Sequence, residues 1–385
     1  MTAPLSPVPV AAPGAEHTQR EIAQQPELWR RVDRIVADDR APLDAFLSPL
    51  LAEPRLRIVL TGAGTSAYAG EILRATLAAR TGRRVDAVAT TDIVADPHGC
   101  FEDDLPTLLV SFARSGNSPE STAAADHATA LLSRCAHLVV TCNADGALAR
   151  AHRERSDSHV LLTPPAAEDR GFAMTSSLTC MLLSVLLAFG QHPAGGADAL
   201  AAAAQAVVSG ELGARVDAFA GGAPERVVYL GSGALKALAG ESALKLLELT
   251  GGAVAAWADS SLGFRHGPKA FLTDRTSAVV YVSNDPYTRR YDLDILAELR
   301  AALPEGRVAA VAGRPDGLPA DDLTWLLPGM AGADDAALAL PAVVCAQRVA
   351  LRASLDRGIR PDNPFPDGEV NRVVQGVTIH PLPTG

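Results

Sequence analysis

The chain has 385 residues, of which 48% are hydrophobic and 20% charged, and its formal net charge is −10. The length allows two domains of ordinary size, each with its own core, and the composition excludes an intrinsically disordered protein. Because no basic stretch offsets the negative charge, nucleic acid is excluded as the main partner, whereas a small anionic substrate is not.

The cysteine pattern and the start of the chain predict a cytoplasmic protein. No spacing typical of metal ligands occurs, so we expect reduced thiols and no metal at the five cysteines, Cys100, Cys135, Cys142, Cys180 and Cys345. No apolar run reaches the ~18 residues that a membrane span needs. Residues 1–17 lack the basic start and apolar core of a signal peptide, and we expect them to form a disordered tail.

The first ordered segment expected from the sequence is helical. Thr18 and Glu21 have the spacing of a capping box, which predicts that Thr18 caps a helix. Pro26 is expected to break this helix or to cap a new one, and helical spacing then continues to Phe46. We therefore predict N-terminal helices over residues 18–50.

Alternating β-type and helical segments follow over residues 51–195. Short apolar runs are typical of strands, and Gly-rich turns or Ala-rich helical stretches separate them. Strands that alternate with helices in this way predict a parallel sheet with helices on both faces. The expected strands are 57–60, 85–89, 108–112, 138–141 and 159–162, and the expected helices include 71–79 and an apolar helix near 177–189.

The pattern then repeats after an Ala/Gly-rich segment, 193–213, which predicts a helical connection over 196–222. Residues 226–233 resemble 57–64, and 239–241 resemble 69–71 with one extra residue in the second loop. A repeat at a spacing of about 170 residues is too long for a solenoid unit and indicates duplication of a whole domain. We predict two tandem doubly wound α/β domains, 51–195 and 223–360, with later strands at 277–283, 308–312 and 323–327 and a tail over 361–385.

A Gly-rich turn, residues 62–66, lies between a predicted strand and a predicted helix. Glycines there let the backbone approach a ligand, and N–H groups at a helix N-terminus favour an anion. Gly64, Thr65 and Ser66 are therefore candidates for phosphate binding. The turn also resembles the dinucleotide fingerprint, with Asp86 where a ribose-binding acid is expected, so this loop alone leaves both ligands open.

A second loop favours the single phosphate. Ser111, the run 114–118 and Ser121 place hydroxyl groups at another strand-to-helix junction, and such junctions meet at the carboxyl ends of a doubly wound sheet. Two hydroxyl-rich loops suit one phosphate, whereas a dinucleotide does not require the second loop. The hydroxyls of residues 175–177 form either a third cluster or a helix cap. The candidates in the second loop are Arg114, Ser115, Asn117 and Ser118.

The second half carries candidate acid–base groups. Glu241, Lys245 and Glu248 fall on one face of a predicted helix that follows the second Gly-x-Gly loop, so its N-terminal part faces the ligand region. The alternative for such a helix is a solvated face with an ordinary ion pair. His266 follows in a loop, residues 260–269, with glycine and proline on either side of the histidine. Such a loop can present an imidazole to a cleft.

These loops and motifs together resemble the sugar isomerase (SIS) domain superfamily. Within it, the chain resembles the galactosamine-6-phosphate deaminase/isomerase family, also called tagatose-6-phosphate ketose/aldose isomerases, and more distantly the isomerase half of glucosamine-6-phosphate synthase. The resemblance covers nearly the whole chain, from Glu21 to the tail segment 369–378. It implies a homo-oligomer, at least a dimer, and no cofactor.

The resemblance also implies roles for matched residues. Ser66, Ser115 and Ser118 would hold the phosphate, Glu248 would move a proton between C1 and C2, and His266 would open the sugar ring, in the neighbouring chain's site if the sites lie at the subunit interface. Lys245 matches a lysine near the same site. Gln375 stands where the synthase has a lysine that reaches the substrate.

The expected function is therefore conversion of a 2-amino-2-deoxyhexose 6-phosphate, such as galactosamine 6-phosphate, to a ketose 6-phosphate and ammonia. No glutaminase domain precedes Thr18, which favours deamination over amino-sugar synthesis. An aldose–ketose isomerase and a fructosamine-6-phosphate deglycase share this site and stay open as alternatives. Two other hypotheses stay open. A non-catalytic sugar-phosphate sensor predicts binding without turnover, and a dinucleotide enzyme predicts binding of a nicotinamide cofactor.

Overall fold

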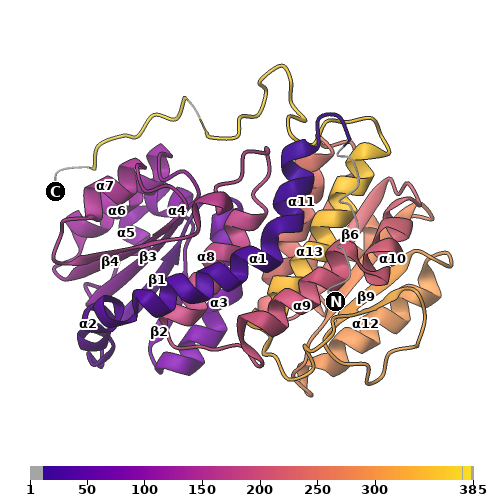
Figure 1. Ribbon diagram of the computed structural model, residues 1–385, viewed down its shortest axis with the longest axis horizontal. Coiled ribbons are helices and arrows are strands. Elements are labelled where there is room, and N and C mark those ends of the chain that lie inside the picture. Colours follow the sequence, from indigo (N-terminus) through magenta and orange to yellow (C-terminus); the bar gives the residue numbers. More distant parts are fainter. Residues whose placement is uncertain (1–11, 375, 383–385) are drawn as a thin grey trace, which may run out of the picture.

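A computed structural model describes residues 12–374 and 376–382 of the chain. Two five-stranded sheets lie side by side in it, each flanked by helices (Figure 1). Every strand pair in both sheets is parallel. The predicted tandem doubly wound α/β architecture is therefore confirmed, while the domain boundaries drawn from the sequence stay a prediction.

The first sheet has the strand order β2-β1-β3-β4-β5. Its central strands β1 and β3 are buried along their whole length, as near-continuous apolar runs covered by helices on both faces must be. The strands are β1 Arg57–Thr61, β2 Arg84–Ala87, β3 Thr107–Ala113, β4 Cys135–Thr141 and β5 Ser158–Leu162. The helices are α3 Thr65–Thr81, α4 Thr90–Ala95, α5 Pro97–Cys100, α6 Pro119–Leu131, α7 Ala147–His152 and α8 Ser176–Ala188.

The second sheet repeats this arrangement, with the strand order β10-β9-β8-β6-β7. If β6 is matched with β1 and the later strands follow in chain order, the two orders are the same. The strands are β6 Arg226–Gly231, β7 Ala255–Ser260, β8 Thr276–Val282, β9 Val308–Ala312 and β10 Thr324–Leu326. The helices are α11 Ala234–Leu249, α12 Thr288–Ala302 and α13 Asp335–Leu355, with 3₁₀ turns η2 Gly263–Arg265 and η3 Pro268–Phe271.

The two copies of the repeat differ in length by one residue, and the structure puts this residue at another place than the prediction did. Gly64 and Gly233 both precede a helix directly, with φ/ψ of 55°/−124° and 57°/−126°, and each lies seven residues after the first arginine of its strand. The two loops are therefore equally long. The extra residue lies inside α11, not in the second loop, so the prediction that placed it in the loop is wrong.

The N-terminal helices differ from the predicted ones. α1 is one helix, Glu16–Asp38, that runs through Pro26, and α2, Arg40–Leu51, follows it. The capping box is wrong because Thr18 already lies inside α1, where its N–H and hydroxyl both donate to Asp362 of the C-terminal tail. Glu21 instead binds a loop of the first domain, so tertiary contacts have taken over both residues of the motif.

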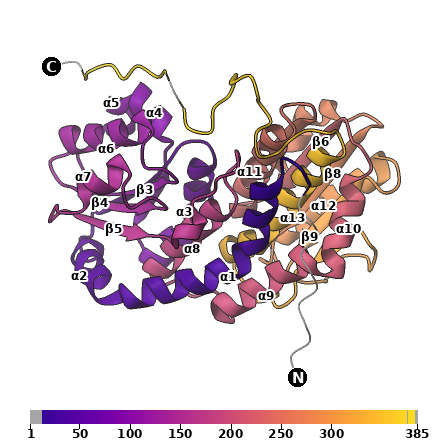
Figure 2. The same ribbon diagram turned by 45° about the horizontal axis from the view of Figure 1, so that its top comes forward.

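Helices also join the two halves. α1 crosses from one half to the other and contacts α8, α9 Gly196–Ser209 and α13 (Figures 1 and 2). α9 and α10, Glu211–Ala220, form the predicted helical connection. One hydrophobic core runs through both halves from α1 and α8 to α11 and α13. The C-terminal tail extends from α13 over the first domain in both views.

One helix in the described part of the chain, α13, is long and apolar enough to cross a membrane by length and composition alone. Most of its apolar stretch is buried among the other elements of the fold. The same test is met by the core helix of many globular proteins, and α13 packs most closely against α11.

Candidate active site

The two predicted phosphate loops leave neighbouring strands of the first sheet. β1 and β3 pair in register as far as Thr61 and Ser111, and after these strands the chain turns toward opposite edges of the sheet. Ligands of doubly wound sheets bind at such a switch point, outside the carboxyl ends of the strands. The fold therefore brings the loops 62–64 and 114–118 together at the carboxyl end of the first sheet, a place that we call the first crevice.

The first loop is open on one side and tied to the second domain on the other. Gly64 has a positive φ that favours glycine, and no other atom lies within 4 Å of the position a Cβ would take. The Thr65 hydroxyl, one of the predicted phosphate ligands, donates to Glu241 Oε1 at 3.4 Å. Ser66 is buried, with its Oγ 3.9 Å from the Met174 sulfur.

The second loop is held by its own side chains. Ser118 caps α6: its Oγ accepts from the Ser121 N–H at 3.3 Å and lies 2.7 Å from the Ser121 Oγ. Asn117 Oδ1 accepts from the Ala147 N–H at 2.9 Å, and Ser115 Oγ accepts from the Asn117 N–H at 3.3 Å. The loop is thus fixed before a ligand arrives, which lowers the entropy that binding has to overcome.

Arg114 is a buried cation in this loop. Its guanidinium donates to the Phe172 carbonyl at 3.2 Å and to the Arg372 carbonyl in the tail at 2.7 Å. Burial and the positive charge of Arg372 lower its pKa, while the negative charges of Asp169 and Glu248 favour its charged form. Within residues 12–374 and 376–382 no carboxylate forms an ion pair with Arg114. A buried guanidinium without such a partner is suited to an anionic ligand.

The three polar residues of α11 lie on one face, as predicted, but that face is buried. Lys245 Nζ is 3.6 Å from Glu241 Oε1 and also contacts Glu248 Oε2. Glu241 and Lys245 are fully buried, whereas the Glu248 side chain is 25% exposed. The alternative of a solvated face is therefore wrong.

The protonation of this group follows from its burial. Burial raises the pKa of Glu241 to about 8, against the opposing effect of Lys245. Burial disfavours the charged Lys245, but the two neighbouring carboxylates outweigh it and raise the lysine's pKa. Lys245 is thus held as a cation between two acids of different exposure, and Glu248 is the one that a ligand can reach.

Close packing of α3 on α11 joins the phosphate loop to this group. A Cβ on Gly240 would lie 2.5 Å from Tyr68 Cε1, so only glycine permits this approach of the two helices. Thr65 at the start of α3 therefore meets Glu241 in the middle of α11. Residues predicted from opposite halves of the sequence share one site.

Among the described residues, no hydrogen bond or ion pair joins His266 to these site residues within a single chain. His266 lies between η2 and η3 with its side chain exposed, and in the described residues its ring makes no hydrogen bond. The loop around it is braced, because Arg265 and Lys269 both bind Glu298 of α12. Gln375, the other predicted residue outside the main cluster, lies outside the described residues.

The loop between β5 and α8 is a part of the site that the sequence did not reveal. Asp169 is fully buried and accepts hydrogen bonds from the N–H and hydroxyl groups of Thr175, Ser176 and Ser177. These hydroxyls are neither a free cluster nor the helix cap, because Asp169 itself caps α8. Phe172 and Met174 of the same loop contact Arg114 and Ser66.

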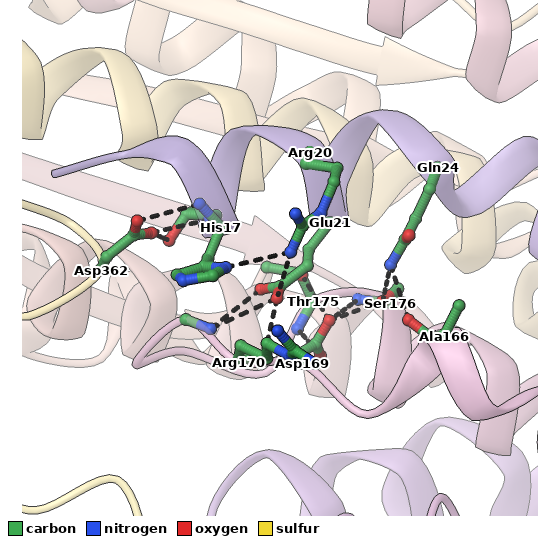
Figure 3. Close-up of polar contacts among 12 residues, drawn as sticks. His17, Arg20, Glu21, Gln24, Ala166, Asp169, Arg170, Thr175, Ser176 and Asp362 are labelled. Atoms are coloured by element: carbon green, nitrogen blue, oxygen red, sulfur yellow. Dashed lines mark hydrogen bonds and ion pairs between the residues drawn. The ribbon is translucent and has the colours of Figure 1, made fainter. Parts of the chain in front are cut away.

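Glu21 of α1 fixes this loop from the other side (Figure 3). Its carboxylate accepts from the Arg170 N–H at 2.6 Å and from the Gly171 N–H at 3.1 Å. Burial and the charge of Asp169 raise the pKa of Glu21 to about 7. Figure 3 also shows His17 of α1 bound to Asp362 of the tail. A cavity of about 280 Å³ lies between α1 and the loop, and none of the predicted site residues lines it.

The structure weakens the dinucleotide reading of the first loop. Asp86 forms ion pairs with Arg57 at 2.6 Å and with Arg84 at 2.9 Å, so its carboxylate is not free for a ribose.

At the crevice, the hydroxyls of Thr61, Thr90 and Ser111 are buried and have no hydrogen-bond partner among the described residues. No three His, Cys, Asp or Glu side chains of the described chain are grouped to hold a metal ion.

Comparison with known proteins shows the family to which the chain belongs. The SIS domain family matches residues 50–190. AgaS of Streptomyces coelicolor is 62% identical over 384 residues, which cover 99% of this chain and 100% of that protein. The chain belongs to the AgaS family of SIS-domain proteins. The resemblance stated from the sequence motifs is therefore confirmed.

Two further members come from Escherichia coli. A protein named D-galactosamine-6-phosphate deaminase AgaS is 45% identical over 381 residues, 98% of this chain and 99% of that protein. A crystal structure described as tagatose-6-phosphate ketose/aldose isomerase superposes with a TM-score of 0.85 at 41% identity, covering 97% of this chain and all of that one. The AgaS fold thus extends over the whole described chain, both sheets included.

Proposed function

We propose that this AgaS-family chain is a deaminase/isomerase that converts D-galactosamine 6-phosphate to tagatose 6-phosphate and ammonia. Full-length relatives at 45–62% identity carry the deaminase name, and the related crystal structure carries the isomerase name. The isomerase name refers to proton transfer between an aldose and a ketose, and the proposed deamination contains a transfer of the same kind before the amino group is lost.

One structural observation carries the proposal. A buried polar chain runs from Thr65, in the phosphate loop, through Glu241 and Lys245 to Glu248. Of the three charged residues only Glu248 has a substantially exposed side chain. A sugar bound by its phosphate at the first sheet would therefore present its other end to a single accessible carboxylate.

Glu248 is suited to be the base of the reaction. In the open-chain sugar it takes the proton from C2 and returns it to C1, while a proton passes from the amino nitrogen to O1. The aldehyde thereby becomes a C1 hydroxyl group and the amine becomes a C2 imine. Water adds to the imine, the C–N bond breaks, and the products are the ketose 6-phosphate and ammonia. One carboxylate suffices because C1 and C2 are adjacent. Lys245 holds this carboxylate in place and stabilises negative charge that develops beside it.

The phosphate is proposed to lie in the first crevice. Hydroxyl donors would come from Ser66, Ser115 and Ser118, and further donors from the backbone N–H groups after Gly64. Asn117 would keep the second loop in shape. Arg114 would supply a buried positive charge beside the phosphate. Glu241 and Thr65 join this crevice to the base, and Gln375 is expected to approach the sugar from the tail.

Ring opening requires a second group, and His266 is proposed for it. Because its side chain is exposed and its loop is braced, we propose that it acts in the site of a neighbouring subunit of a homo-oligomer, at least a dimer. The net charge of −10 and a metabolic substrate support a cytoplasmic enzyme that binds no nucleic acid or membrane.

The test is a substrate panel with two readouts. D-galactosamine 6-phosphate, D-glucosamine 6-phosphate and fructosamine 6-phosphate are supplied separately, and ammonia and ketose 6-phosphate are measured together. We expect equal amounts of both products, formed fastest from the galacto sugar. Galactose 6-phosphate, which has no amino group, is added as a fourth substrate. Its conversion to a ketose 6-phosphate, with no ammonia released from the amino sugars, would indicate a pure isomerase. Ammonia from fructosamine 6-phosphate alone would indicate a deglycase, and binding without any product would indicate a sensor.

A further inference from the structure

The second sheet has a crevice that corresponds position by position to the phosphate crevice of the first. β3 and β8 are each followed by five loop residues and then a helix, α6 or α12. The residue after the strand is Arg114 in the first domain and Ser283 in the second. The fifth residue of the helix is Ala123 in α6 and Asp292 in α12.

Asp292 fills the second crevice. It is fully buried, and its Oδ1 accepts from the Ser232 hydroxyl at 2.6 Å and from the Ser261 hydroxyl at 2.5 Å. Its Oδ2 accepts from the Ser283 N–H at 3.0 Å. These donors follow β6, β7 and β8, the strands that meet at the switch point of the second sheet. Hydroxyl and N–H donors from three loops thus converge on one anionic group, the arrangement expected around a bound phosphate.

Other carboxylates use the remaining donors of this crevice. Asp335 accepts from the Ser283 hydroxyl at 2.6 Å and from the Asn284 N–H at 3.0 Å. Asp285 accepts from the N–H groups of Tyr287 and Thr288 at the start of α12. Backbone carbonyls accept from the next two N–H groups, those of Arg289 and Arg290, so among the described residues each of these N–H groups at the start of α12 already has a partner.

The first crevice has the opposite character. Arg114 brings a positive charge where the second domain has Ser283, and Ala123 brings no polar group where the second domain has Asp292. The buried hydroxyls of Thr61 and Ser111 lack partners among the described residues. In the first crevice, Arg114 and the hydroxyls of Thr61 and Ser111 therefore have no carboxylate partner among the described residues, whereas the corresponding donors of the second crevice bind a carboxylate of their own domain.

We infer that the Asp292 carboxylate occupies the place of the ligand phosphate in the second domain, so that each chain binds one sugar phosphate, in the first domain only. The inference rests on the proposed function for the position of the phosphate in the first crevice. It also explains how a duplicated domain lost one of two sites and kept the loops rigid: a carboxylate on α12 ties the loop before α11 to the loop before His266.

The first test moves the built-in anion to the first domain. Ala123→Asp should weaken binding of galactitol 6-phosphate, which has no carbonyl and cannot react, by about 100-fold or more, because like charges in one site repel. Ala123→Asn, with a neutral side chain of the same size, should stay within about tenfold of the wild type. Isothermal titration calorimetry gives both affinities and should give one site per wild-type chain.

A Ser115→Ala/Ser118→Ala variant separates the two hypotheses. If it weakens binding and Ala123→Asp does not, the correspondence with Asp292 is wrong. If neither weakens binding, the phosphate does not lie in the first crevice and the proposed site is wrong. Two sites per wild-type chain would also overturn the inference.

The second test removes the anion from its present place. Asp292→Ala should lower the melting temperature, and sodium formate should restore part of the loss, because a small carboxylate can enter the vacated position. Neutral formamide, and sodium chloride at the same ionic strength, should restore less. Formate should give the wild type no such gain. If formate stabilises Asp292→Ala no more than chloride does, Asp292 does not stand in the place of an anion.

Discussion

The contact between α3 and α11 predicts whether a substitution at Gly240 raises or lowers the stability of the protein. Gly240 lies inside α11, and a Cβ there would lie 2.5 Å from Tyr68 Cε1 and 2.9 Å from Cζ. Gly240→Ala must therefore push the Tyr68 ring, or the whole of α3, away by about half an ångström or more. Because α3 begins with Thr65 and Ser66, the movement would separate the phosphate loop from Glu241 and Glu248.

The magnitude follows from two opposing effects. Inserting a methyl group into a packed interface costs about 1–3 kcal/mol, whereas Ala in place of Gly in a helix interior gains about 1 kcal/mol. We expect a net loss of up to about 2 kcal/mol in the free energy of unfolding. A displacement of this size between binding and catalytic groups should lower kcat by about tenfold, given that a full ångström costs about 100-fold.

Urea unfolding and steady-state ammonia release measure the two effects. Tyr68→Ala is combined with Gly240→Ala, and the double variant should lose less stability than the two single losses added together, because the removed ring leaves room for the methyl group. The reasoning is refuted if Gly240→Ala is more stable than the wild type by about 1 kcal/mol and has wild-type turnover.

Three further predictions concern groups around the site and in the first core. Burial and nearby His152 lower the pKa of His137 to about 4. Below pH 6.5 the unfolded chain therefore binds a proton that the folded chain does not. The free energy of unfolding should fall by up to about 3 kcal/mol as the pH drops from 6.5 to 4. Urea titrations should show a flatter pH dependence for His137→Gln but not for His98→Gln at an exposed position; equal slopes would contradict this assignment. Asp169→Asn should lower the free energy of unfolding by about 2–3 kcal/mol, because six donors at α8 lose a charged acceptor, and a change below about 0.5 kcal/mol would be inconsistent with it. Arg114→Gln should raise KM for the amino-sugar phosphate at least about tenfold with a smaller effect on kcat, and an unchanged KM would exclude Arg114 from phosphate binding.

The sequence predicted the elements whose pattern is local. The strands of the first domain begin and end within a few residues of the predicted positions, since short apolar runs between turn residues are typical of buried parallel strands. β7 was missed because it is a half-exposed edge strand with few β-branched residues, Ala-Ala-Trp-Ala-Asp-Ser. α13 was missed because it is apolar on nearly all sides and has no helical period to recognise.

The site was predictable where a motif lies within one loop or helix, and not where distant segments meet. The spacing of Glu241, Lys245 and Glu248 gave their common face, but only the fold shows that this face is buried against Thr65. The same limit explains the failed capping box. Thr18 and Glu21 bind residues more than 140 positions away, which no local rule describes. The hydrogen bonds between Asp169 and the start of α8 could not be predicted either, because the loop that carries Asp169 has no regular sequence pattern.

The central claim is that Glu248 moves the proton that leads to deamination, and a single comparison tests it. Ammonia release from D-galactosamine 6-phosphate is measured for the wild type, for Glu248→Gln and for Glu305→Gln, an exposed control in the same domain. We predict that Glu248→Gln loses at least about 100-fold in kcat while galactitol 6-phosphate still binds, and that the control keeps full activity. Turnover by Glu248→Gln within about tenfold of the wild type would contradict the account.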